Sequence, residues 1–95
     1  MAKEFTKEMM ELAVAKSNSV KGTPHYGAYY VPFEENLNGK WYFLGWGDAN
    51  RTGTIKKGRN GGLFVYYTDA WGNRFRFLLT TALVELFNLT SEGVA

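Results

Sequence analysis

Hydrophobic and polar residues alternate most regularly in segment 62–79, GLFVYYTDAWGNRFRFLL, where two runs of period two flank a short polar turn. This alternation is typical of a pair of half-buried β-strands. A type I turn that begins at Asp69, with Gly72 in the left-handed position after it, would pair Asp69 with Asn73. The sequence therefore predicts a β-hairpin, around which the rest of the chain is organised.

The register of this hairpin decides which side chains share a face. With Asp69 opposite Asn73, one face is apolar and is predicted to be core: Leu63, Val65, Tyr67, Phe75, Phe77 and Leu79. The other face mixes rings with arginines: Phe64, Tyr66, Thr68, Arg74, Arg76 and Leu78. A slip of one residue, with Gly72 and Asn73 as a type II′ loop, would turn Phe64 and Tyr66 toward the core instead.

Helical periodicity is confined to the two ends of the chain. In segment 3–16 the apolar residues recur at helical spacing, and the predicted stripe consists of Phe5, Met9, Leu12 and Ala13. Near the other end, Thr80 or Thr81 can cap a helix that runs to about residue 89. We interpret the stripe of the first helix as a core-packing face, with docking of a partner helix as the alternative.

Three further strands are predicted between the first helix and the hairpin, at residues 26–33, 40–46 and 51–57. The turn signal Asn38-Gly39 joins the first two. Pro32 cannot donate to a ladder and so belongs at an edge, a bulge or a strand end, and Glu34 and Glu35 after it indicate a solvated, protected edge. Strand 40–46 is apolar on both sides, so it is either covered on both faces or presents aromatic rings to solvent or a ligand.

These elements predict a single α+β domain spanning residues 1–95. It consists of an N-terminal helix, a curved antiparallel meander of five strands and a short C-terminal helix. The element order resembles the small SH3-like barrels of archaeal chromatin proteins, so the resemblance implies a partly open barrel and favours DNA binding.

The distribution of charge along the chain says more about possible partners than the overall composition does. The formal net charge is only +2, but segment 51–80 contains six basic residues and Asp69 as its one acid: Arg51, Lys56, Lys57, Arg59, Arg74 and Arg76. Such a concentration of positive charge can attract a polyanion.

The residues offer little for catalysis. The chain has no cysteine and only one histidine, His25, and its acids lack the spacing of a metal site or an acid–base pair. The segment KKGRNGG lacks the arrangement of a phosphate-binding loop and is interpreted as a hairpin loop. We therefore expect no enzyme, no metal and no cofactor. Without a signal peptide or an apolar run of membrane-spanning length, we expect a cytoplasmic protein that makes no membrane contact.

The basic, aromatic face of the hairpin is the best candidate for function. Its rings could stack on exposed bases while its cations contact phosphates, so we predict a non-enzymatic module that binds nucleic acid. The candidate residues are Arg51, Lys56, Lys57, Arg59, Phe64, Tyr66, Trp71, Arg74 and Arg76. Alternatively, the same surface docks on a host protein, as small phage or plasmid inhibitors do, or a terminal helix covers it and makes its rings part of the core.

Overall fold

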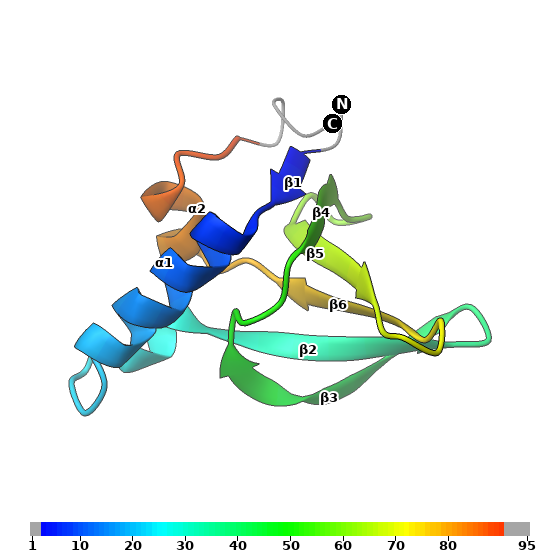
Figure 1. The fold of residues 1–95 in the computed structure, drawn as a ribbon, viewed down its shortest axis with the longest axis horizontal. Helices are drawn as coiled ribbons and strands as arrows, with labels where there is room; N and C mark the ends of the chain where they lie inside the picture. The colour runs from blue at the N-terminus through cyan, green and yellow to red at the C-terminus, as the bar shows by residue number, and fades with distance from the viewer. Residues whose placement is uncertain (1–2, 91–95) are drawn as a thin grey trace.

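The structure, a computed structural model, describes residues 3–90. Six strands form one open antiparallel sheet in the order β1-β4-β5-β6-β2-β3, and an α-helix lies near each end of the chain (Figure 1). The predicted α+β fold is confirmed. The elements are β1 (Lys3–Phe5), α1 (Lys7–Ser19), the 3₁₀ helix η1 (Tyr26–Tyr29), β2 (Tyr30–Leu37), β3 (Lys40–Asp48), β4 (Gly53–Lys57), β5 (Leu63–Thr68), β6 (Arg74–Leu78) and α2 (Thr81–Leu86).

The order of the strands differs from a simple meander in two ways. The β2–β3 hairpin joins the sheet through β2, which pairs with β6, and β3 is left at an edge. The short strand β1, which the sequence did not predict, forms the opposite edge beside β4. After β3 the chain crosses to the far half of the sheet, and the buried side chain of Ala49 anchors this crossing in the core.

The predicted register of the β5–β6 hairpin is confirmed. Tyr67 lies opposite Phe75, and the N–H of Asp69 donates to the carbonyl of Asn73 over 3.0 Å. Gly72 has a φ of +84°, the left-handed conformation that glycine adopts without steric cost. The alternative register, shifted by one residue, is therefore wrong.

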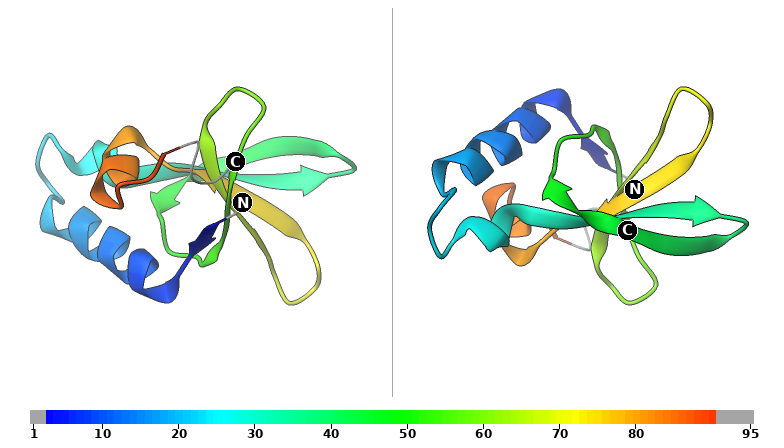
Figure 2. Two further views of the ribbon diagram at one scale, coloured as in Figure 1. Left: turned by 90° about the horizontal axis from the view of Figure 1, so that it is seen from above. Right: turned by 90° about the horizontal axis from the view of Figure 1, so that it is seen from below.

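The predicted apolar face of this hairpin is packed into the core. Val65 and Phe77 are fully buried, and Leu63 and Leu79 nearly so. Both helices contribute to the same cluster, through Ala13 of α1 and Leu83 of α2. Both helices lie together at one end of the sheet, while the β2–β3 and β5–β6 hairpins spread apart at the other (Figures 1 and 2). The helices therefore cover the core face, and the opposite face, which we call the outer face, has no helix packed on it among residues 3–90.

The N-terminal helix begins later than predicted, because residues 3–5 pair with β4 as strand β1. Thr6 caps the helix, since its Oγ1 accepts the N–H of Met9 over 3.2 Å. With Phe5 outside the helix, the buried stripe shifts, and the prediction of Leu12 as a core residue is wrong because Leu12 is 52% exposed. The residues that pack inward are Met9, Met10, Ala13 and Ser17.

Strand β2 also starts later than predicted, because residues 26–29 form the 3₁₀ helix η1. Pro32 is tolerated inside β2 because it pairs with Trp46 on one side, while the pairing with β6 on the other side starts only at Phe33. The interpretation of Glu34 and Glu35 as a solvated edge is wrong, since β2 lies between β3 and β6.

Two smaller predictions concern β3 and the last helix. Strand β3 presents aromatic rings to solvent, the second of the two predicted arrangements, with Phe43 58% and Trp46 63% exposed. Thr80 caps α2 as predicted, through a bond from the N–H of Leu83, but the helix ends at Leu86. The next two residues turn the chain, and the side chain of Leu89 is buried in the core.

Candidate functional site

The outer face is organised around the guanidinium group of Arg76. Its central carbon lies 4.2 Å from the ring centroid of Trp41 and 4.1 Å from that of Phe64. The cation is thus in contact with two aromatic rings, a favourable arrangement because each ring face is electron-rich.

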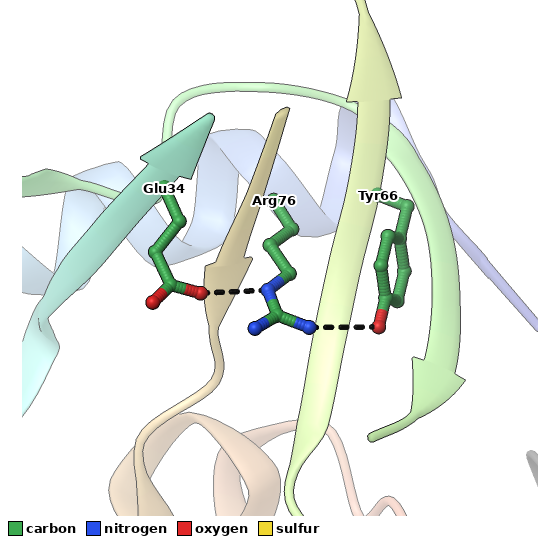
Figure 3. Close-up of polar contacts among 3 residues, drawn as sticks. All are labelled: Glu34, Tyr66 and Arg76. Carbon is green, nitrogen blue, oxygen red and sulfur yellow. Dashed lines mark hydrogen bonds and ion pairs between the residues drawn. The ribbon is translucent and has the colours of Figure 1, made fainter. Parts of the chain in front are cut away.

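Two polar side chains fix the orientation of Arg76. Its Nε donates to Oε1 of Glu34 over 2.6 Å, and its Nη1 donates to the hydroxyl of Tyr66 over 3.3 Å (Figure 3). The three residues come from the neighbouring strands β2, β6 and β5, directly across from one another. Because the Glu34 carboxylate neutralises it and only 17% of its side chain is exposed, Arg76 holds the surface together rather than offering a free positive charge.

The sheet curls toward this face. Trp41 belongs to β3 and Tyr66 to β5, with β2 and β6 between them, yet their ring centroids lie 5.8 Å apart. Neighbouring strands are spaced by about 4.8 Å, so a flat sheet would hold β3 and β5 roughly 14 Å apart. The curl turns the outer face into a groove.

Three adjoining hollows make up this groove. The largest, of about 620 Å³, is lined by Trp41, Lys56, Tyr66 and Arg74 together with threonine side chains. It shares Trp41 with a second hollow of about 450 Å³, which in turn shares Arg59, Asn60 and Arg76 with a third of about 320 Å³. We call the continuous surface the basic groove and define it by Trp41, Lys56, Arg59, Phe64, Tyr66, Arg74 and Arg76.

Three exposed basic side chains line the basic groove, and the carboxylate of Glu4 lies at its border, where Oε1 accepts from Thr54 Oγ1 over 3.2 Å. No aspartate or glutamate is among the residues that line the three hollows. Arg76 is neutralised by Glu34, but Lys56, Arg59 and Arg74 are exposed. The ammonium group of Lys56 lies 5.8 Å from the ring centroid of Tyr66, and Arg74 Nη2 donates to Oδ1 of Asn36 over 3.0 Å. The groove thus combines three solvent-exposed cations with half-buried rings.

Six of the nine residues singled out from the sequence meet in this groove, and three lie elsewhere. Arg51 lies near Tyr67 and Phe75, in a separate hollow of about 410 Å³. Lys57 lies opposite Leu63 and therefore points to the core face at the rim of the sheet. Trp71 is in the β5–β6 turn and is 85% exposed. The six in the groove are Lys56, Arg59, Phe64, Tyr66, Arg74 and Arg76.

Sequence reasoning missed Trp41 and Glu34, the two residues that orient Arg76 from the β2–β3 hairpin. The turn signal at Asn38-Gly39 predicted that the two strands of this hairpin pair, and in the structure Trp41 lies opposite Asn36. It gave no indication that β2 pairs with β6, because this pairing joins residues about 40 positions apart in the chain. The signal that could have found Glu34 is its charge, opposite to that of the two arginines on β6.

Among the described residues outside the groove, three ionisable groups have displaced pKa values. A hydrogen bond with Tyr30, followed by burial, raises the pKa of Tyr26 to about 12. Burial raises the pKa of Tyr67, and the charge of Arg51 opposes this shift. Hydrogen bonds from Asn73, first from its side chain and then from its backbone, lower the pKa of Asp69 against a smaller opposing effect of burial. The Asp69 shift shows that the ionised carboxylate stabilises the turn of the β5–β6 hairpin.

Other kinds of site find little support in residues 3–90. This part of the chain contains no group of three or more His, Cys, Asp or Glu side chains that could hold a metal ion. His25, the single histidine, is exposed, and its backbone N–H donates to Thr23 Oγ1. None of the helices in the same part of the chain is long and apolar enough to cross a membrane.

Comparisons with protein families, with curated proteins and with solved structures gave no match to this chain. Its function is therefore inferred from the geometry of its own residues.

Proposed function

We propose that the protein is a non-enzymatic binding module whose basic groove takes single-stranded nucleic acid. The observation that supports this proposal is the continuity of the groove, in which three exposed cations lie beside a series of aromatic rings. Sequence-tolerant single-strand binding proteins combine these same two features, a positive groove along the backbone and rings that stack on bases.

The rings in the groove suit stacking. Trp41, Phe64 and Tyr66 are each half-buried, so part of each ring is accessible while the rest is held by packing. Phe43 and Trp46 continue the aromatic surface along β3, with their centroids 6.1 Å apart. Stacking of a base on an aromatic ring contributes about 1 to 3 kcal/mol, so two or three such contacts support useful affinity.

The exposed cations suit phosphates. Lys56 and Arg74 line the same hollow, and Arg59 lies in the loop that borders the other two. Unpaired bases are required for ring stacking, because in a duplex the base faces are already stacked on each other. We therefore infer a preference for single strands over duplexes.

Fluorescence anisotropy of labelled oligonucleotides, measured over a series of salt concentrations, tests this proposal. With three phosphate contacts, the logarithm of the affinity should fall with the logarithm of salt concentration with a slope of roughly −2 for single strands. A duplex of the same sequence should bind more weakly. Absence of binding at low salt, or binding that salt does not affect, would contradict the proposal.

Docking on a host protein through the same groove is the second candidate. The contacts of Arg76 with the rings of Trp41 and Phe64 and with the hydroxyl of Tyr66 favour it, because arginine, tryptophan and tyrosine are enriched among the anchor residues of protein interfaces. Since Arg76 is neutralised inside the chain, such binding would depend mainly on packing and little on salt. The salt series therefore separates the two candidates.

A further inference from the structure

Strand β3 forms a long open edge of the sheet. It has nine residues and stands at the end of the strand order, whereas the other edge strand, β1, has only three. An edge strand presents unpaired N–H and C=O groups to which another strand can bind. The charged residues that commonly protect such an edge are confined to the two ends of β3, Lys40 and Asp48.

Exposed apolar side chains gather on the same strand. Tyr42, Phe43, Leu44 and Trp46 are each about half exposed or more, and they lie on both faces of β3. Among the other large exposed apolar residues of the described chain, Leu37 lies beside β3, opposite Lys40, whereas Leu12, Trp71 and Leu86 lie on α1, in a turn and on α2. An exposed apolar patch beside an open strand edge is typical of a protein interface.

We propose that β3 pairs antiparallel with β3 of a second copy of this chain, so that the two sheets join into one across a two-fold axis. The charges at the ends of the strand favour this occupant and this direction. Antiparallel pairing brings the Lys40 end of each copy near the partner's Asp48, whose carboxylate also accepts from Ser17 Oγ of its own chain, whereas parallel pairing would place like charges at the same end. An interface of this symmetry closes on itself and yields a dimer.

Pro32 reveals which backbone groups of β3 face outward. Pro32 has no N–H and lies opposite Trp46, so this pair cannot be hydrogen-bonded, and Trp46 directs its own N–H and C=O to the free edge. Pairing with β6 is continuous from Phe33 to Asn36, so the backbone groups of Glu34 point to the same side of β2 as those of Pro32. Its partner Phe43 therefore also directs its backbone groups outward. By the same alternation, so do Trp41 and Asp48.

These outward groups define a register for the dimer. The β2–β3 ladder shifts between Phe33 and Glu34, which leaves Leu44 without a partner as a β-bulge. In this register Phe43 lies opposite the partner's Trp46, and Trp41 lies opposite the partner's Asp48. Residues that direct their backbone N–H and C=O groups outward therefore face each other on both sides of the bulge. The two bulges then face each other across the axis.

This register also gathers aromatic rings. Phe43 and Trp46 of one chain already lie edge to face, with centroids 6.1 Å apart. The two-fold axis would place the same pair of the partner next to them, and cross-strand aromatic pairs of this kind stabilise sheets. The dimer would place both basic grooves on one side of the joined sheet, but it does not depend on nucleic-acid binding.

Sedimentation velocity of the full chain without nucleic acid, over a wide range of protein concentrations, tests the proposal. The expected result is a reversible equilibrium between monomer and dimer that shifts to dimer as concentration rises. A protein that sediments as a monomer at every concentration would overturn the proposal, whatever other partner the edge then takes.

Two variants locate the interface. Phe43→Pro removes an outward N–H that the β2–β3 ladder does not use, and Trp46→Lys places a charge in the aromatic cluster; both should remain monomeric. Leu12→Lys is the matched control, because Leu12 is exposed to a similar extent on α1 and its substitution should leave the dimer intact. Circular dichroism verifies that each variant is folded. If folded Trp46→Lys dimerises like the wild type, β3 is not the interface.

Discussion

Glu34 and Arg76 lie directly opposite each other on β2 and β6, and their side chains form an ion pair of 2.6 Å on the outer face of the sheet. The pair connects the β2–β3 hairpin to the β5–β6 hairpin at the point where the sheet curls. It also removes the charge of the most central arginine of the basic groove, so Arg76 positions the rings while other residues supply the free cations.

Glu34→Gln should lower the free energy of unfolding by about 1–2 kcal/mol, because a largely buried guanidinium group loses its charged partner. Urea denaturation measures this change. Glu35→Gln is the matched control, since Glu35 is the next residue of β2 and points to the opposite face. If both substitutions lower the free energy of unfolding equally, the ion pair makes no specific contribution to stability.

Glu34→Gln should also strengthen the proposed binding of nucleic acid, although it lowers stability. Glu34→Gln leaves Arg76 with an uncompensated positive charge in the groove, so single-stranded oligonucleotides should bind more tightly at low salt, with a steeper dependence on salt. Anisotropy titrations of the folded variant measure this. Weaker binding with an unchanged slope would indicate that the pair acts only through the shape of the groove.

The turn of the β5–β6 hairpin should lose stability in acid. The folded-state pKa of Asp69 lies below its ordinary value of 3.8, so its contribution is fully present above that value and is lost as pH falls through the lowered pKa. Asp69→Asn retains an acceptor for the turn but does not titrate in this range. The difference in unfolding free energy between wild type and variant should therefore shrink below pH 3.8, and a difference independent of pH would contradict this role.

Gly53→Ala should destabilise the protein and displace Tyr66. A Cβ at Gly53 would overlap the carbonyl oxygen of Tyr66 and approach Val65 Cγ1 to 3.0 Å, so β4 and β5 would have to move apart. Overpacking of this kind costs about 1 to 3 kcal/mol. Gly27→Ala is the control, because an added Cβ there meets no atom within 4 Å. Chemical denaturation should show a loss of stability for Gly53→Ala alone.

The sequence predicted local features of the fold well. The β5–β6 register followed from Asp69 and Gly72, and the Asn38-Gly39 turn marked the β2–β3 hairpin, because in both the chemistry of a few neighbouring residues decides the geometry. The pairing of β2 with β6 could not be predicted, since local patterns carry no information on which strand lies beside which. The same limit hid strand β1 and the edge position of β3.

The residues of the candidate site were likewise predicted where a local pattern places them and missed where the pairing of distant strands does. Phe64, Tyr66, Arg74 and Arg76 were placed on one face by alternation within a single hairpin. Arg51 and Lys57 were included only because they are basic, and they lie outside the groove, since loop direction and strand register decide where they point. Trp41 was missed because it reaches Arg76 only through the curl of the whole sheet.

Lys56 and Lys57 offer the most direct test of the proposed function. They are adjacent on β4 and both exposed, but Lys56 lines the basic groove while Lys57 points to the opposite face. Binding of a single-stranded oligonucleotide by Lys56→Ala and Lys57→Ala, over the same salt series as the wild type, compares the two faces at equal charge. Lys56→Ala should bind more weakly and with a slope shallower by about 0.7, and Lys57→Ala should match the wild type. Equal losses in the two variants, or a loss in Lys57→Ala alone, would contradict binding in the groove.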